Sequence, residues 1–152
     1  MIVQGFIDLV EQNADTLTQE LMQELRIRKG TDHYRSLPDD VLQERVNRVL
    51  SNVTKRLSSW LSKSKPKDTL FAYYRELGRE RFREGIPLEE VVLVLMLIKR
   101  RIWKFITSHA TFATDYRLDQ LFELNYAVGL FFDRIVLAAI TGYQEEQSHP
   151  SA

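Results

Sequence analysis

The segment from residue 126 to residue 140 constrains the fold of this 152-residue chain more than any other segment. Twelve of its fifteen residues are apolar, and the exceptions are Gly129, Asp133 and Arg134. A helix at a protein surface needs an apolar stripe on only about half of such positions. Something must cover the surplus, so we expect this helix to pack on the core with one face and on a partner with another.

The rest of the chain also follows a helical period, which indicates an all-α fold. The expected helical segments are residues 4–29, a segment after Asp40 with an apolar stripe from 42 to 61, and residues 67–84, 87–108 and 114–146. We expect about five helices, arranged as a bundle or in a globin-like fold without haem. No repeat or low-complexity tract divides them, so residues 1–152 are expected to be a single domain.

Composition excludes several classes of protein. The chain has no cysteine, which rules out disulfides, thiol catalysis and Cys-ligated metals. Lys+Arg and Asp+Glu both number 21, so the chain as a whole is not a basic nucleic-acid binder. No apolar run approaches the roughly 18 residues of a membrane span, and the amino-terminal residues lack the basic region of a signal peptide. We therefore expect no membrane insertion and a cytoplasmic location.

The balanced total hides an asymmetry along the chain. Residues 63–104 carry 11 basic and 6 acidic groups, whereas residues 105–152 carry 2 and 6. These two regions could pair within the fold or across a partner, or they could be solvated helix faces. The most compact basic cluster comprises Lys99, Arg100, Arg101 and Lys104. It could hold an anion or touch nucleic acid, but cations near the carboxyl end of a helix explain it more simply.

The sequence contains no pattern of catalytic or cofactor-binding residues. It lacks a Gly-rich phosphate loop, a Gly-x-Ser-x-Gly turn and a His-Glu-x-x-His pair. A haem would take His109 as its axial ligand, but this residue falls at an expected helix terminus, so we expect no cofactor and no metal. The adjacent carboxylates Glu89-Glu90 and Glu145-Glu146 are typical of helix caps and solvated ends, not of an acid–base pair. We do not expect an enzyme.

The break between the third and fourth segments has a defined chemistry. Gly85 can take the left-handed conformation that ends a helix, and Pro87 can open the next helix at its first position. Gly78 lies inside the third segment, where glycine costs about 1 kcal/mol relative to alanine. A neighbouring helix at close approach would justify that cost. These three residues are therefore expected to define the shape of the fold.

The same region carries a family resemblance. The stretch LGRERFREGIPLEEV at residues 77–91, followed by IKRRIW at residues 98–103, resembles the RsbR/RsbRD-type N-terminal domain. The upstream YRSLP at residues 34–38 fits the same pattern. The resemblance implies an all-α sensor or regulatory domain, related in some members to a globin fold without haem. It transfers no catalytic residue and identifies no small-molecule ligand.

The resemblance also implies the partners of such a domain. Domains of this type precede STAS modules in stressosome proteins or kinase modules in bacterial two-component sensors, are generally dimeric, and pass their signal through the last helix. We therefore expect a non-catalytic input domain that could be a fragment of a longer signalling protein. The alternative is a stand-alone helical adaptor that presents the same apolar helix to a different partner. An enzyme acting on small molecules is the least supported hypothesis.

The last helix is where the homodimer interface is expected. Phe131, Ile135 and Ala138 share one face, and Phe132 and Ala139 lie on the adjacent face. The small residues would let two such helices approach closely, and symmetric pairing is the commonest closed arrangement. The spacing leaves open which face points inward, so either Phe131 or Phe132 is expected to meet the partner.

Overall fold

Seven helices form the described part of the chain, which is residues 2–61, 68–109 and 114–150 of the computed structural model. They are α1 (Ile2–Gln12), α2 (Ala14–Ile27), α3 (Asp32–Arg35), α4 (Asp39–Leu61), α5 (Asp68–Arg83), α6 (Leu88–Thr107) and α8 (Leu118–Ser148). The all-α fold class expected from the periodicity is confirmed. The number of helices in these ranges is seven, and the expected count of about five is too low.

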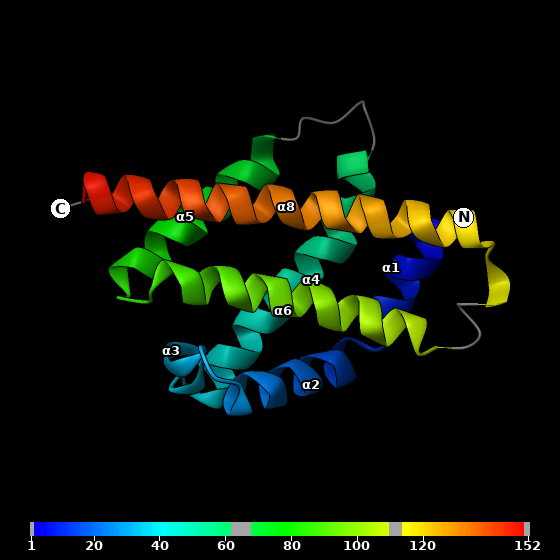
Figure 1. The fold of residues 1–152 in the computed structure, drawn as a ribbon, viewed down its shortest axis with the longest axis horizontal. Coiled ribbons are helices and arrows are strands. Elements are labelled where there is room, and N and C mark those ends of the chain that lie inside the picture. The colour runs from blue at the N-terminus through cyan, green and yellow to red at the C-terminus, as the bar shows by residue number, and fades with distance from the viewer. Residues whose placement is uncertain (1, 62–67, 110–113, 151–152) are drawn as a thin grey trace.

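The long helix α8 spans the length of the molecule, and α6 runs beside it in the opposite direction (Figure 1). Helices α4 and α5 lie behind this pair, and α2 and α3 pack below α6. One hydrophobic cluster contains buried residues from every described helix. Because their partners lie mainly on one side, α6 and α8 each keep a face that the other described helices do not cover.

The first expected segment divides into α1 and α2 at Asn13. The side-chain amide of Asn13 donates a hydrogen bond to the carbonyl oxygen of Leu9 at 2.9 Å, so it competes with the backbone for a helical acceptor. The buried residues on either side, Val10 and Leu17, lie seven apart, which is close to two helical turns. The apolar period therefore continues across the break and does not reveal it.

The turn between α5 and α6 has the geometry that its sequence predicts. Gly85 has a φ of 78°, in the left-handed region. The N–H of Ile86 donates to the carbonyl oxygen of Arg81 at 3.1 Å, and the N–H of Gly85 donates to that of Phe82 at 2.9 Å. These two bonds are typical of a helix that ends at glycine. Pro87 lies one position earlier than expected, because its ψ of 144° is extended and α6 begins at the next residue.

Helices α5 and α8 are in backbone contact. A Cβ on Gly78 of α5 would lie 2.0 Å from the carbonyl oxygen of Ala139. A Cβ on Gly142 of α8 would lie 1.7 Å from the carbonyl oxygen of Arg75. Neither position has room for a side chain, so α8 is the closely approaching helix that the cost of Gly78 predicts.

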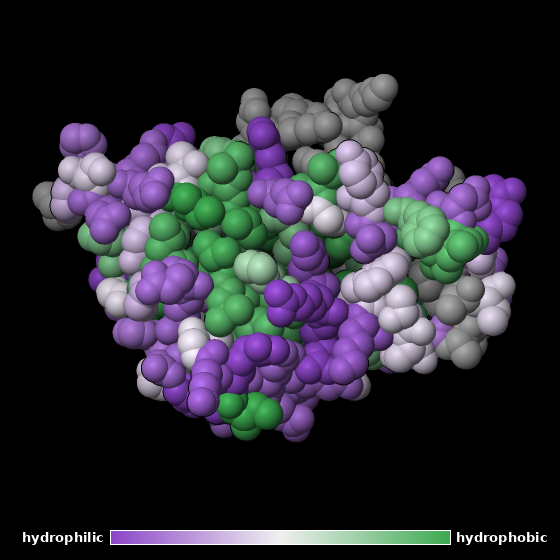
Figure 2. All heavy atoms as spheres, viewed as in Figure 1, coloured by the Kyte–Doolittle hydropathy of each residue, from purple (hydrophilic) through white to green (hydrophobic). Residues whose placement is uncertain are grey.

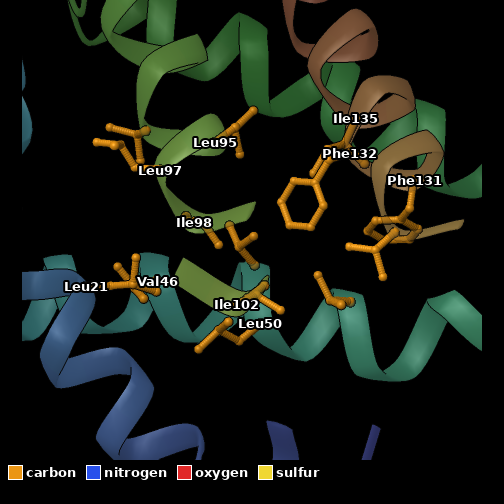
Figure 3. Packing of buried hydrophobic residues seen from close by; sticks show 14 of the residues in the cluster. Leu21, Val46, Leu50, Leu95, Leu97, Ile98, Ile102, Phe131, Phe132 and Ile135 are labelled. Carbon is orange, nitrogen blue, oxygen red and sulfur yellow. The ribbon is translucent and has the colours of Figure 1, made fainter. Parts of the chain in front are cut away.

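All five residues expected at the dimer interface instead lie in the core of the single chain. Phe131, Ile135, Ala138 and Ala139 are 0% exposed, and Phe132 is 2% exposed. Figure 3 shows the labelled residues of α8 directed into the interior, towards α6 and α4. The interface residues named from the sequence are therefore corrected. The buried face of α8 is wide because α5 and α6 both pack on it, and the small residues accommodate α5.

Candidate interaction face

One face of the molecule carries apolar side chains that the described residues leave exposed. Leu137 on α8 is 53% exposed, and Met96 on α6 is 38% exposed. Val92 lies one turn before Met96, Ile140 lies one turn after Leu137, and both are half-buried. We call these four residues the apolar patch. Figure 2 shows apolar surface gathered over α6 and α8 on this face.

An open groove lies between the carboxyl-terminal half of α6 and the amino-terminal half of α8. Its volume is about 570 Å³, and Trp103 of α6 and Tyr126 of α8 contribute to its lining. The Tyr126 side chain is 69% exposed. Gly129 also lines the groove, and a Cβ on this residue would meet no atom within 4 Å. We call this feature the α6–α8 groove. Its size falls within the range of small-molecule sites, roughly 300–1,000 Å³.

The basic cluster of α6 is divided between two sides of the helix. Arg101 pairs with Glu24 of α2 at 2.6 Å. Lys99, Arg100 and Lys104 line the α6–α8 groove instead, and none of them forms an ion pair within the described part of the chain. The attraction of cations to a helix carboxyl terminus is confined to the last turn, and Lys104 is the one basic residue in the last turn of α6. That attraction therefore does not account for the other two cations.

A second cleft, between α4 and α5, has a different charge arrangement. Its volume is about 270 Å³, and its lining is rich in charged side chains. Arg45 pairs with Glu84, Arg48 pairs with Glu44, and Arg81 lies 3.2 Å from Glu84. Because these charges already have partners in the chain, this cleft offers a charged ligand less than the α6–α8 groove does.

Two glutamates expected at solvated helix ends are buried, and that expectation is wrong for them. Glu90 is 4% exposed and Glu146 is 3% exposed. One oxygen of Glu90 accepts a hydrogen bond from the N–H of Tyr34 at 2.9 Å, and the other lies 3.2 Å from Nδ1 of His33. Arg83 donates to Glu146 at 3.3 Å. These carboxylates therefore attach α3 to α6 and α5 to α8.

Ion pairs flank the backbone contact between α5 and α8. Arg75 donates to Glu145 through Nε at 2.5 Å and through a second nitrogen, and Arg79 donates to the same carboxylate at 3.0 Å. The hydrogen bond from Arg75 is the largest cause that holds the pKa of Glu145 at about 2, below its ordinary value of 4.5. Arg75 and Arg79 of α5 thus hold the carboxyl-terminal part of α8 in place.

The histidines lie in three separate places. His109 has its Nδ1 2.8 Å from the carbonyl oxygen of Phe105, and the two rings pack with centroids 4.3 Å apart. His33 lies beside Glu90, and His149 follows the end of α8. Within the described ranges no group of three His, Cys, Asp or Glu side chains is placed to hold a metal ion.

By length and composition, α8 is the one described helix that could cross a membrane. Its candidate window of 18 residues has a mean hydropathy of 1.4, and 39% of that window is buried inside the fold. This composition does not test insertion, so the expectation of no membrane insertion stays a prediction. Core helices of soluble proteins pass the same test, so the composition of α8 is weak evidence for insertion.

The fold and this face together describe an all-helical domain with a tightly joined α5–α8 pair and one exposed apolar side. The chain belongs to the family of the RsbT co-antagonist protein rsbRD N-terminal domain, whose family model matches residues 15–151. The match confirms the resemblance carried by the α5–α6 sequence, and the family is one of regulatory co-antagonist domains. Searches of curated proteins and of solved structures find no match.

Sequence reasoning missed the α6–α8 groove. Gly129 stood out only as an exception in an apolar run, and Tyr126 only as the first residue of that run. The available signal was a helical glycine with no assigned neighbour, four residues before another exception, Asp133. Separating the paired cation of α6 from the three unpaired ones required the position of α2, which no local pattern supplies.

Proposed function

We propose that this chain is a non-catalytic input domain of a bacterial signalling protein, acting in the cytoplasm as a homodimer. Membership of a regulatory co-antagonist family supports the signalling role. The output module in this proposal is a STAS or kinase module joined to the carboxyl end of α8. In this proposal the two subunits meet through the apolar patch, and not through the buried residues that the sequence predicted at the interface.

The exposure of Leu137 is the observation that carries the dimer proposal. Leu137 of α8 is 53% exposed and Met96 of α6 is 38% exposed, and Val92 and Ile140 on the same two helices add half-buried apolar surface. Figure 2 shows apolar surface gathered over these two helices. Contiguous apolar surface of this kind marks interaction sites on soluble proteins more often than free surface. A patch formed by two long antiparallel helices is also rigid, so two copies can meet without reordering.

The contact between α5 and α8 supports the relay. Gly78 and Gly142 hold the two backbones together, and Arg75 and Arg79 bind Glu145 beside them. A shift of α8 at the subunit contact therefore cannot be absorbed by slippage along α5 without breaking these contacts. In this proposal the α5–α8 pair moves as one body against the partner copy, and a small sliding of helices packed across such a contact is the shear type of switch.

The test is the mass of the protein in solution. We expect a wild-type dimer by light scattering at micromolar concentration. Leu137→Glu and Met96→Glu are expected to give folded monomers, because each places a charge in the contact. Ile27→Glu is the matched control, since Ile27 is an 83% exposed apolar residue of α2, a helix that contributes no residue to the patch. It should leave the dimer intact.

A wild-type chain that is monomeric at high micromolar concentration would contradict the dimer. That result would favour the second candidate, a helical adaptor that presents the same apolar patch to a different protein. A STAS or kinase sequence following this domain in the full-length protein would favour the input domain over the adaptor.

A further inference from the structure

Gly129 is a helical glycine that the packing of the chain does not require. A Cβ on Gly78 or on Gly142 would lie within 3 Å of backbone atoms of the facing helix. A Cβ on Gly129 would meet nothing within 4 Å, and its φ is not positive. Glycine is unfavourable inside a helix. Because Gly129 has no side chain, the floor of the α6–α8 groove stays open at this position.

The charges around this floor are predominantly positive. Lys99, Arg100 and Lys104 line the groove without ion pairs in the described ranges, and Asp133 is the carboxylate among the lining residues. Cations gathered in a concave site raise the local concentration of anions. The chain pairs Arg101, their neighbour on the same helix, and leaves these three unpaired.

The walls of the groove suit a flat apolar body. Trp103 and Tyr126 contribute aromatic surface and Leu130 contributes aliphatic surface. Tyr126 and Leu130 are 69% and 39% exposed, so contact surface is available to an incoming molecule. The volume of about 570 Å³ exceeds what a simple inorganic ion fills.

We propose that the α6–α8 groove binds a small organic anion with a flat apolar body and a carboxylate headgroup. The body lies over Gly129 between the aromatic side chains, and the carboxylate meets the cations of α6. This site is distinct from the apolar patch, and binding at it does not depend on the proposed dimer or on the relay.

The experiment uses 2-naphthoate as the probe and 2-naphthamide as its neutral counterpart, with acetate as the headgroup alone. Binding is measured by isothermal titration calorimetry and by two-dimensional ¹H–¹⁵N spectra of the whole chain. We expect 2-naphthoate to shift the backbone amide of Gly129 and to bind at least tenfold more tightly than 2-naphthamide. Acetate at the same concentration should produce no shift.

Two variants and a control locate the site. Gly129→Leu fills the floor without meeting another atom at its Cβ, and Lys99→Gln combined with Arg100→Gln removes two cations. Each is expected to weaken 2-naphthoate binding at least tenfold while the helical circular dichroism is retained. Arg101→Gln lies next to these cations in sequence but faces α2, so it should bind the probe like the wild type.

Equal affinities for 2-naphthoate and 2-naphthamide would overturn the proposal, and so would unchanged binding in Gly129→Leu. If Gly129→Leu instead changes the mass by light scattering and the probe does not bind, the groove is a contact between copies of the chain. That result also overturns the proposal. Because Leu137→Glu tests the dimer separately, the site and the proposed function can fail independently.

Discussion

At the scale of single residues, replacing either of two helical glycines by alanine is expected to change the stability in opposite directions. We expect Gly78→Ala to lower the free energy of unfolding by about 1–3 kcal/mol, because the new methyl group would overlap a backbone carbonyl of α8 that has little freedom to move. Gly129→Ala should raise it by about 0.5–1 kcal/mol, because alanine is the better helix former and its Cβ enters open space. Urea unfolding followed by circular dichroism measures both. Changes of the same sign would contradict the different packing of the two glycines.

Local chemistry made some residues predictable and others not. The left-handed conformation of Gly85 follows from the Gly-Ile-Pro sequence itself, because few other residues tolerate it. The burial of Glu90 and Glu146 does not follow from sequence, because each carboxylate is buried by a partner more than fifty residues away in the chain. Adjacent glutamates look the same in sequence whether they are solvated or satisfied by distant donors.

At the scale of elements, α8 carries both fully buried and exposed apolar residues, and its composition alone does not distinguish them. Phe131→Glu and Phe132→Glu are both expected to unfold the protein, because each would bury an unpaired charge in the cluster. Leu137→Glu, on the same helix, should remain folded with native helical circular dichroism. Thermal unfolding of the three variants measures the difference. A folded Phe132→Glu variant would show that this face of α8 is less enclosed than the structure has it.

The ion pairs between α5 and α8 predict a dependence on pH. The folded pKa of Glu145 lies at about 2, below the ordinary value of 4.5, so its contribution is complete above pH 4.5 and is lost as the pH falls towards 2. We expect Glu145→Gln to lower the melting temperature at pH 6, and the difference from wild type to vanish near pH 2. Glu123→Gln is the control, since Glu123 is an exposed residue of the same helix with no ion pair within the described ranges.

A melting-temperature difference for Glu145→Gln that stays constant from pH 6 to pH 2 would mean that the ionised carboxylate does not stabilise this helix pair.

Element types were predictable where the apolar period was strong, and element breaks and faces were less so. The period from Val10 to Leu17 stays in phase across Asn13, so the change of direction between α1 and α2 leaves no trace in it. For α8 the period identified two apolar faces, and both are buried in the core of the chain. It could not assign them, because the width of the buried face depends on how α5 and α6 are placed around it.

At the scale of the whole molecule, one continuous core predicts one unfolding transition. The hydrophobic cluster draws Phe6 from α1, Tyr34 from α3 and Leu124 from α8, so no described helix has a separate core. We expect tryptophan fluorescence and far-ultraviolet circular dichroism to give the same urea midpoint, as for a two-state protein. Two midpoints would indicate that residues 1–152 contain more than one cooperative unit.

The position of the α5 contact along α8 has a mechanical consequence. Gly142, where the backbones touch, lies between Gly129 and the end of the helix at Ser148. With a rise of about 1.5 Å per residue, Gly129 lies roughly 20 Å before this contact and Ser148 roughly 9 Å beyond it. Gly78 meets Ala139 on one side of Gly142, and Arg83 binds Glu146 on the other, so α5 holds α8 on both sides of Gly142. A displacement of α8 alone would break these contacts, whereas a displacement of α5 and α8 together keeps them. A change at the groove therefore reaches the carboxyl end of α8 as a movement of both helices.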